Sequence, residues 1–130
     1  MKKRKSFTLV ELMLVVIIIL ILAGLAFPRL AGRAEKARRV AAKAEVEGTI
    51  PSALDLYEMD VGEYPEKLED LISNPGTEAW DGPYLRKVPK DPWKSDYHYS
   101  REGEHGLDYD LASKGRDGVL GSEDDIVNWE

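Results

Sequence analysis

The stretch from residue 113 to residue 126 gathers oxygen-bearing side chains that could bind a metal ion. It contains four carboxylates, from Asp117, Glu123, Asp124 and Asp125, together with three glycines. Calcium prefers such hard oxygen ligands, although the spacing differs from that of an EF-hand loop. A solvent-exposed Asp-Gly turn followed by an acidic patch explains the same residues, and the residue types alone favour that interpretation over a calcium site.

Glu11 is a second candidate, because it interrupts an otherwise apolar stretch. Residues 12–27 carry no charge, and a charged side chain inside a membrane-spanning segment costs about 2.5–3.5 kcal/mol. If the chain were cut between Ser6 and Phe7, the new α-amine would lie one helical turn from Glu11. The amine of a neighbouring subunit could then neutralise the carboxylate. A Glu11 that stays hydrated near the lipid headgroups is the alternative, and these residues alone do not separate the two.

The other polar residues form no recognisable catalytic group. The chain has no cysteine, which excludes thiol catalysis, cysteine-ligated zinc and disulfides. His98 and His105 are the only histidines and do not form a zinc-type pair. Packing in a small core explains the Tyr and Trp side chains better than a ligand groove does. We therefore expect no enzyme activity, and a formal net charge of −6 argues against binding to nucleic acid.

The candidate residues must be positioned by the elements around them, and the first of these is a membrane anchor. Residues 7–28 approach the length of about 20 residues with which a helix crosses a bilayer. The basic residues at positions 2–5 predict a cytoplasmic N-terminus, with everything after Pro28 on the other side. A cleaved secretory signal peptide is the alternative. Its apolar region is usually about 7–15 residues long and ends at a small-residue cleavage site, which fits this segment less well.

After the anchor, alanine and charged residues at helical spacing predict a helix over residues 29–60. Gly48 and Pro51 predict a kink or a short break near 48–51. Residues 61–130 are rich in Gly and Pro and leave room for short elements only. We expect a helical turn at 68–73 and two strands, 97–100 and 107–111, paired across the turn at 102–106. The fold class is α+β: a long N-terminal helix, transmembrane in its first half, packed on a small antiparallel sheet.

The sequence from Lys5 to Leu12, KSFTLVEL, resembles the class III leader of type IV pilins and pseudopilins. In those proteins a short basic leader ends at a small residue, phenylalanine follows, and glutamate is the fifth residue after the cut. The resemblance implies that residues 1–6 are a leader peptide, removed between Ser6 and Phe7 by a prepilin peptidase that also methylates the new terminus. It assigns Glu11 to subunit assembly. The family usually has glycine where this chain has Ser6.

Several motifs of the head are similar to those of the major pseudopilins of type II secretion systems, which belong to the same pilin-like superfamily. They are LDLYEMD at 54–60, GEYP at 62–65, GPYL at 82–85, PKDPW at 89–93, His105-Gly106 and the ending from Ser113 to Trp129. The resemblance implies that Ca²⁺ is bound by Asp117, Asp124 and Asp125 together with loop carbonyls, and that the ion closes a C-terminal calcium-binding loop. It does not assign a role to Glu123.

The resemblance implies a structural subunit of the secretion pseudopilus. Such a subunit sits in the bacterial inner membrane with one pass and its head in the periplasm. It polymerises with itself and with minor pseudopilins, using an inner-membrane platform protein and a secretion ATPase, and the periplasmic filament drives export of folded proteins. A type IV pilin for adhesion, motility or DNA uptake is the alternative, although those pilins commonly close their C-terminal region with a disulfide. A membrane-anchored binding module or enzyme is a further alternative, but the sequence shows no catalytic cluster.

Overall fold

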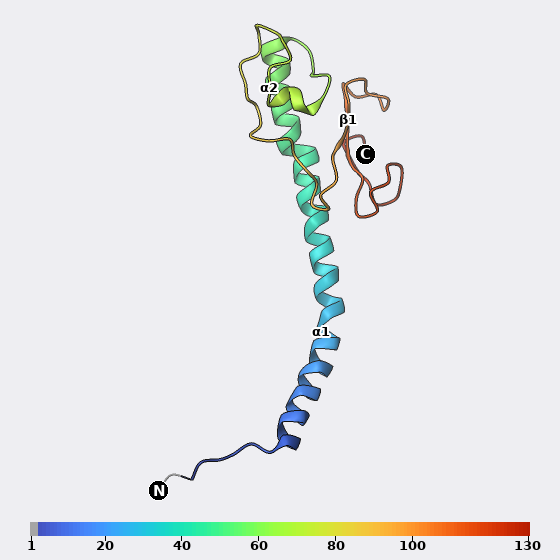
Figure 1. Cartoon of the computed structure of the whole chain (residues 1–130). Helices are drawn as coiled ribbons and strands as arrows, with labels where there is room; N and C mark the ends of the chain where they lie inside the picture. The colour runs from blue at the N-terminus through green and yellow to red at the C-terminus, as the bar shows by residue number, and fades with distance from the viewer. Residues whose placement is uncertain (1–2) are drawn as a thin grey trace. The chain divides into compact units, whose positions relative to one another are not determined.

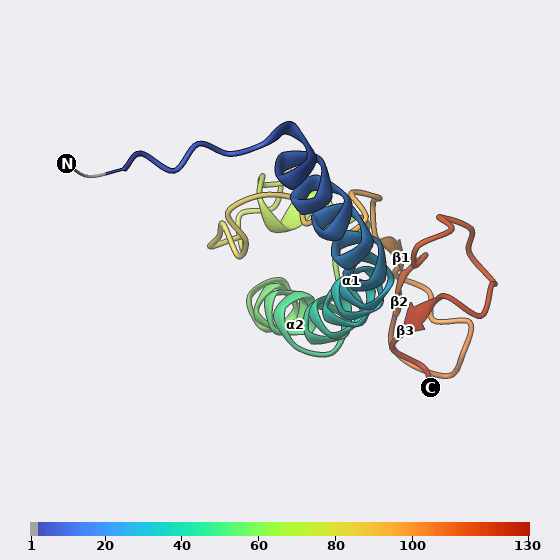
Figure 2. The same cartoon turned by 90° about the horizontal axis from the view of Figure 1, so that it is seen from below.

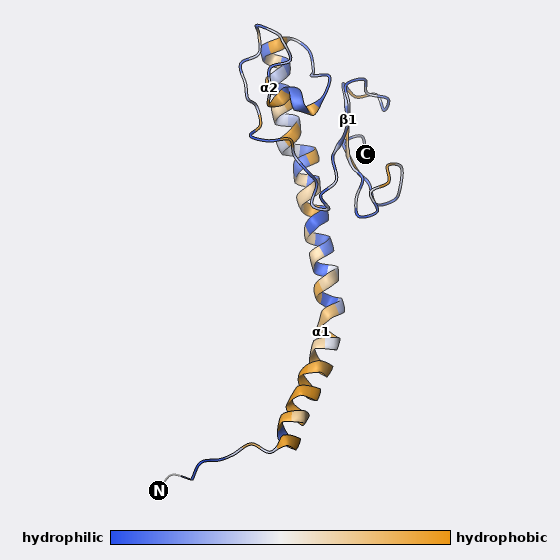
Figure 3. Ribbon diagram, viewed as in Figure 1, coloured by the Kyte–Doolittle hydropathy of each residue, from blue (hydrophilic) through white to orange (hydrophobic). Residues whose placement is uncertain are grey.

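The computed structural model describes residues 3–130, which belong to two compact units that divide after Lys36 (Figure 1). The first helix, α1 (Leu9–Ala44), begins in the first unit and ends in the second. Its large apolar side chains from Leu9 to Phe27 are about half exposed or more, and Figure 3 shows this stretch as strongly hydrophobic. By length and composition, this helix can cross a membrane.

Two further helical segments follow α1 directly. The π-helical segment η1 (Glu45–Thr49) leads into α2 (Ile50–Val61), with Pro51 in the first turn of α2. The amide of Ile50 donates to the carbonyl of Glu45, five residues back. A proline inside a regular helix loses one hydrogen bond and clashes with the carbonyl four residues earlier. The π turn directly before Pro51 is therefore the place where the regular hydrogen-bonding pattern of the helix changes.

This segment changes one expectation drawn from the sequence. We predicted a kink or a short break near 48–51; the backbone remains helical through α1, η1 and α2, so there is no break, and the kink stays a prediction. The irregularity is a change in the hydrogen-bonding pattern rather than an interruption. The helix then ends at Gly62, where a φ of 92° gives the left-handed conformation that glycine adopts without strain.

The core of the second unit is built on one face of the helical segments. Val46, Ile50 and Leu54 recur at intervals of four residues and are fully buried. They pack with Leu111 and with other buried residues of the second unit, namely Ala42, Ala53, Tyr57, Leu68, Leu71, Tyr97 and Ile126. Six further tyrosine and tryptophan side chains cover this cluster: Tyr64, Trp80, Tyr84, Trp93, Tyr99 and Tyr109. The expected role of these aromatic residues in packing is confirmed.

Three short strands form one antiparallel sheet in the order β1-β2-β3 (Figure 2). They are β1 (His98–Ser100), β2 (Asp110–Ser113) and β3 (Ile126–Val127). Tyr99 pairs with Leu111, and Ser113 pairs with Ile126. Every residue of β2 is buried, as befits the central strand of a sheet that packs on a helix.

The α+β fold class and the pairing of the first two strands are therefore as predicted. The boundaries of the second strand are not, because we expected 107–111 and the strand runs from 110 to 113. Residues 107–109 alternate in polarity like a strand but belong to the connection after β1. The two-residue β3 has no signal of its own in the sequence. A 3₁₀ helix, η2 (Leu68–Leu71), accounts for the helical turn expected at 68–73.

Tyr97, just before β1, and Tyr99, within β1, make hydrogen bonds to other parts of the unit through their hydroxyl groups. Tyr97 donates to the carboxylate of Glu45 in η1, and Tyr99 donates to the carbonyl of Pro65 at 2.7 Å. Burial is the main cause that raises the pKa of Tyr97 and that of Tyr99, and for Tyr97 the Glu45 carboxylate adds to it. Both phenols thus stay protonated and act as hydrogen-bond donors at neutral pH.

Candidate functional site

The N-terminal end of α1 is closed by two reciprocal hydrogen bonds. The amide of Thr8 donates to Oε2 of Glu11 at 3.1 Å, and the amide of Glu11 donates to Oγ1 of Thr8 at 3.2 Å. This is a capping box, which satisfies two backbone donors that a helix start leaves free. The carboxylate also lies at the positive end of the helix dipole.

Glu11 therefore has a partner within its own chain. From the sequence we expected the carboxylate to need a partner from outside, the terminal amine of a neighbouring subunit. The capping box supplies hydrogen bonds but no positive charge, so the intermolecular pair remains compatible with this geometry. Thr-x-x-Glu was readable in the sequence as a capping signal, since it directly precedes an apolar run.

Ser6 and Phe7, the expected cleavage junction, precede the first turn of α1. Both are exposed, and 87% of the surface of Phe7 is accessible. An extended and accessible segment is what a protease needs at its cleavage site. The first two residues of the expected leader, Met1 and Lys2, lie outside the described residues.

The acidic loop is the connection between β2 and β3, from residue 114 to residue 125. Its carboxylates accept hydrogen bonds from the loop backbone. Oδ2 of Asp124 accepts from the amide of Asp117 at 3.2 Å, and Oδ1 of Asp117 accepts from the amide of Val119 at 3.0 Å. Asp125 accepts from the amide of Gly121 at 2.5 Å and from the hydroxyl of Ser122 at 3.3 Å.

The two ends of the acidic loop come very close together. A Cβ atom on Gly115, whose φ is 64°, would lie 2.3 Å from the carbonyl oxygen of Asp124. Only glycine can therefore occupy this position without moving the backbone. A guanidinium from α1 lies on the same side of the loop, with Nη1 of Arg39 at 3.4 Å from the carbonyl oxygen of Asp124 and 3.9 Å from its carboxylate.

The acidic loop contains the right donor atoms for a hard cation, but they do not converge on one point. Among residues 3–130 there is no group of three or more His, Asp or Glu side chains placed to hold a metal together. The carboxylate of Asp124 contacts the backbone amide of Asp117, whereas the carboxylates of Asp117 and Asp125 are turned toward Val119 and Gly121. Glu123 is exposed. A shared site would require these carboxylates to exchange backbone hydrogen bonds for the ion.

One cluster of functional side chains was missed by the sequence analysis. Nδ1 of His105 lies 2.8 Å from Oδ2 of Asp110, and the imidazole ring stacks on the indole of Trp129 at a centroid distance of 4.0 Å. Asp110 is almost fully buried, and its Oδ1 is a buried polar atom with no hydrogen-bond partner among the described residues. No spacing rule links these three residues, since the tertiary fold brings together the connection between β1 and β2, the start of β2 and the segment after β3.

The fold, the apolar helix and the sequence around Phe7 together define a pilin-like protein. The family model for prokaryotic N-terminal methylation motifs matches residues 1–27, and the model for type II secretion system protein G matches residues 29–129. The chain belongs to the family of type II secretion system protein G. The family match selects the secretion system over the alternative of a type IV pilin for adhesion, motility or DNA uptake.

Individual relatives agree with this assignment over nearly their whole length. The chain is 41% identical to the type II secretion system core protein G of Escherichia coli K12, covering 98% of this chain and 92% of that protein. It is 40% identical to the protein of the same name from Pseudomonas aeruginosa, covering 99% and 97%. A crystal structure of the major pseudopilin from enterohaemorrhagic Escherichia coli matches with a TM-score of 0.63 and 37% identity, covering 78% of this chain and 95% of that one.

Proposed function

We propose that this chain is the major structural subunit of a type II secretion pseudopilus and polymerises through its N-terminal helix. The observation that carries the proposal is the exposed apolar stretch of α1 behind a leader junction, in a chain that belongs to the protein G family. Side chains such as Leu20 and Phe27 are more than half exposed in the single chain. They need either lipid or a neighbouring helix to cover them, and a filament of parallel helices provides the second.

The same features support a location and a set of partners. Before assembly, the subunit spans the bacterial inner membrane once, with its basic N-terminus in the cytoplasm and its head in the periplasm. A prepilin peptidase removes the leader, and the platform protein and ATPase of the secretion system add subunits to a filament that also contains minor pseudopilins. The filament then drives export of folded proteins, and the subunit itself acts mechanically rather than as an enzyme.

Filament formation tests this function directly. Expressed together with the other components of a type II secretion system, the chain should form thin surface or periplasmic filaments visible by electron microscopy, and antibodies against it should label them. It should also restore export in a strain that lacks its own protein G. Finding the processed protein only as dispersed membrane subunits, with no filaments and no restored export, would contradict the proposal.

Processing at the leader junction is a separate prediction. The accessible position of Ser6 and Phe7 ahead of α1 should allow cleavage between them, which removes four basic residues and changes the formal net charge from −6 to −10. Mass spectrometry of the membrane-extracted protein should show an N-methylated Phe7. Ser6→Gly should be cleaved at least as fast, while an intact Met1 or a terminus between Ala23 and Ala31 would show that the leader has another role.

Calcium binding by the acidic loop is the second part of the proposal. Asp117, Asp124 and Asp125 supply carboxylate oxygens within one loop, and the carboxylate of Asp124 already accepts a hydrogen bond from the backbone amide of Asp117. Calcium binds six to eight oxygen ligands in flexible geometry, which suits an irregular loop better than the strict octahedron of magnesium does. The bound ion would supply a fixed positive charge that holds the two ends of the loop together. In a head without disulfides, such a closure stabilises a small core.

A further inference from the structure

Asp91 is a buried carboxylate outside the acidic loop, and no role was expected for it from the sequence. It lies in the turn of residues 91–95 and is only 3% exposed. Its Oδ1 accepts hydrogen bonds from the amides of Trp93 at 3.1 Å and Ser95 at 2.7 Å. Its Oδ2 accepts from the hydroxyl of Ser113 at 2.9 Å. A buried carboxylate becomes tolerable when its oxygens are satisfied in this way.

The Ser113 hydroxyl also binds the backbone of the acidic loop, so it links Asp91 to that loop. Ser113 is the last residue of β2 and is fully buried, and its Oγ accepts from the amide of Gly115 at 3.2 Å. Gly115 is the residue whose missing side chain allows the approach of the Asp124 backbone. The chain of contacts thus runs from the turn at 91–95 through Asp91 and Ser113 to Gly115, and from there to the far end of the loop.

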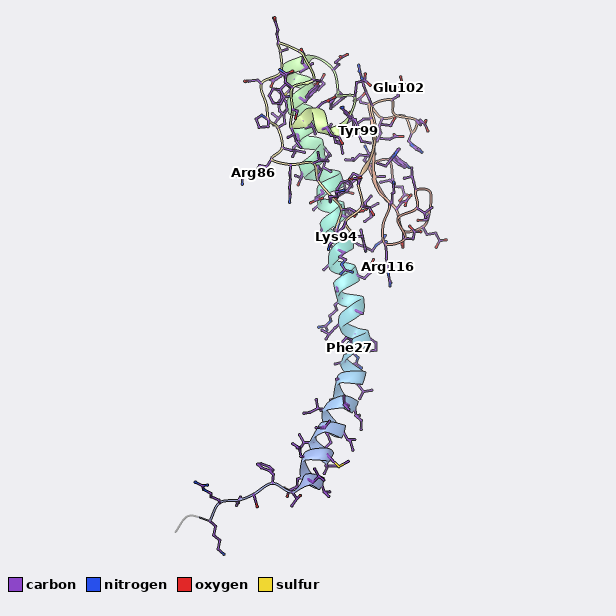
Figure 4. The ribbon with its side chains drawn as sticks, viewed as in Figure 1. Phe27, Arg86, Lys94, Tyr99, Glu102 and Arg116 are labelled. Atoms are coloured by element: carbon purple, nitrogen blue, oxygen red, sulfur yellow. The ribbon has the colours of Figure 1, made fainter. Side chains whose placement is uncertain are left out.

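The same turn also lies near the middle of the acidic loop. The Oγ of Ser95 lies 4.0 Å from the position that a Cβ atom would take on Gly118. Figure 4 labels Lys94 in the turn and Arg116 in the loop, which mark these two segments. The turn is therefore bonded to the base of the loop through Asp91 and Ser113 and lies close to its middle.

We propose that Asp91 is a positioning residue for the acidic loop, acting through Ser113 and Gly115 to hold the two ends of the loop together before a cation binds. This inference rests on the proposed binding of calcium by Asp117, Asp124 and Asp125. Asp91 does not itself bind the ion. It reduces the loss of backbone entropy when the ion binds, because Gly115 and Asp124 are already in place.

Two substitutions interrupt the relay at different points. Ser113→Ala removes the link to Gly115 and leaves the two amide bonds of the turn to Asp91. Asp91→Asn keeps the shape of the side chain and the oxygen that accepts the two turn amides, but its NH2 group cannot accept the hydrogen bond that the Ser113 hydroxyl donates to Oδ2. The first matched control is Ser100→Ala, which removes a hydroxyl at the end of β1 that donates to the carbonyl of Glu102. The second is Asp96→Asn, which removes an exposed carboxylate paired with Lys90.

The full-length processed protein in detergent micelles allows two independent measurements. Amide hydrogen exchange in chelator reports on the Gly115 amide without any ion, and calorimetry with calcium chloride reports the affinity. We expect both relay variants to exchange Gly115 about five- to tenfold faster, as follows from losing one hydrogen bond. We expect their calcium affinity to fall by 10–100-fold, the usual effect of removing a group that orients metal ligands. Both controls should behave like the parent.

The outcomes separate the relay from a general loss of stability and from the calcium proposal. Faster exchange at core amides of α2 in step with Gly115 would indicate unfolding and overturn a specific positioning role. Where Ser113→Ala yields too little folded protein, Asp91→Asn provides the same readouts. Unchanged Gly115 exchange and unchanged affinity in the variants would overturn the relay while leaving calcium binding in place. If the parent protein itself binds no calcium, the ion proposal fails, and the positioning role fails with it.

Discussion

Glu11→Ala is expected to leave the protein in the membrane and to reduce filament formation and export to near zero. Removing a charge from the apolar segment favours insertion, since a carboxylate there costs about 2.5–3.5 kcal/mol. Assembly, in contrast, loses the group proposed to pair with the α-amine of the neighbouring Phe7. Membrane fractionation should therefore show the parent level of protein, and electron microscopy of the same cells should show few or no filaments.

The capping box provides a control that separates two roles of this carboxylate. Glutamine at the third helical position also completes a capping box, so Glu11→Gln keeps the helix start but removes the charge. Thr8→Ala has the opposite effect, because it keeps the carboxylate and removes the hydroxyl partner seen at 3.2 Å. If charge pairing drives assembly, Glu11→Gln should lose filament formation and export as Glu11→Ala does. Normal filaments from Glu11→Gln would show that the capping bonds are sufficient and that no intersubunit charge pair exists.

Calcium is expected to raise the melting temperature of the head strongly compared with chelator. A ligand that binds only the folded state adds about 2.7 kcal/mol at a hundredfold excess over its dissociation constant. For a domain of 60–100 residues, 1 kcal/mol corresponds to about 4–8 °C, so the expected rise is about 10–20 °C. Magnesium at the same concentration should have little effect. Differential scanning calorimetry of the full-length protein in micelles measures both.

Substitutions in the acidic loop test whether the carboxylates cause this effect. Asp117→Asn and Asp124→Asn should each abolish most of the calcium-dependent rise while changing the melting temperature in chelator little, because their bonds in the loop are exposed. Asp96→Asn is the matched control, since Asp96 is an exposed carboxylate of the head outside the loop. A parent protein that melts at one temperature with calcium and with chelator would show that the loop is an acidic turn facing water.

The long apolar helix and the N-terminal methylation motif could be predicted from the sequence because their signals are local. An uninterrupted apolar stretch and the eight residues around Phe7 carry the information by themselves. The strand at 107–111 was predicted from alternation in polarity, and that signal failed at the boundary. Alternation also arises in a connection whose Tyr109 packs on the core, and what decides the strand is the pairing of residues 110–113 with both neighbours.

The carboxylates of the candidate site could be named from the sequence, but the residues that hold the acidic loop in place could not. Clustered carboxylates marked the loop as a candidate, and the resemblance to major pseudopilins selected Asp117, Asp124 and Asp125, whose binding of calcium stays a prediction. Asp91 and Ser113 are ordinary polar residues 22 positions apart, and their role depends on complete burial next to each other. The stacking of His105 on Trp129 likewise depends on the tertiary fold. Such partnerships depend on the tertiary fold, so sequence spacing does not reveal them.

The π turn at Glu45–Thr49 also affects how this chain should be aligned with its relatives. A π turn contains about one residue more than an α turn, so it lets a helix gain a residue without rotating its two ends out of phase. The buried faces before and after it, marked by Ala42 and by Leu54, consequently stay on the same side. A relative with a regular helix here would need a one-residue gap between positions 45 and 49. Placing that gap elsewhere would assign core residues of one protein to surface positions of the other.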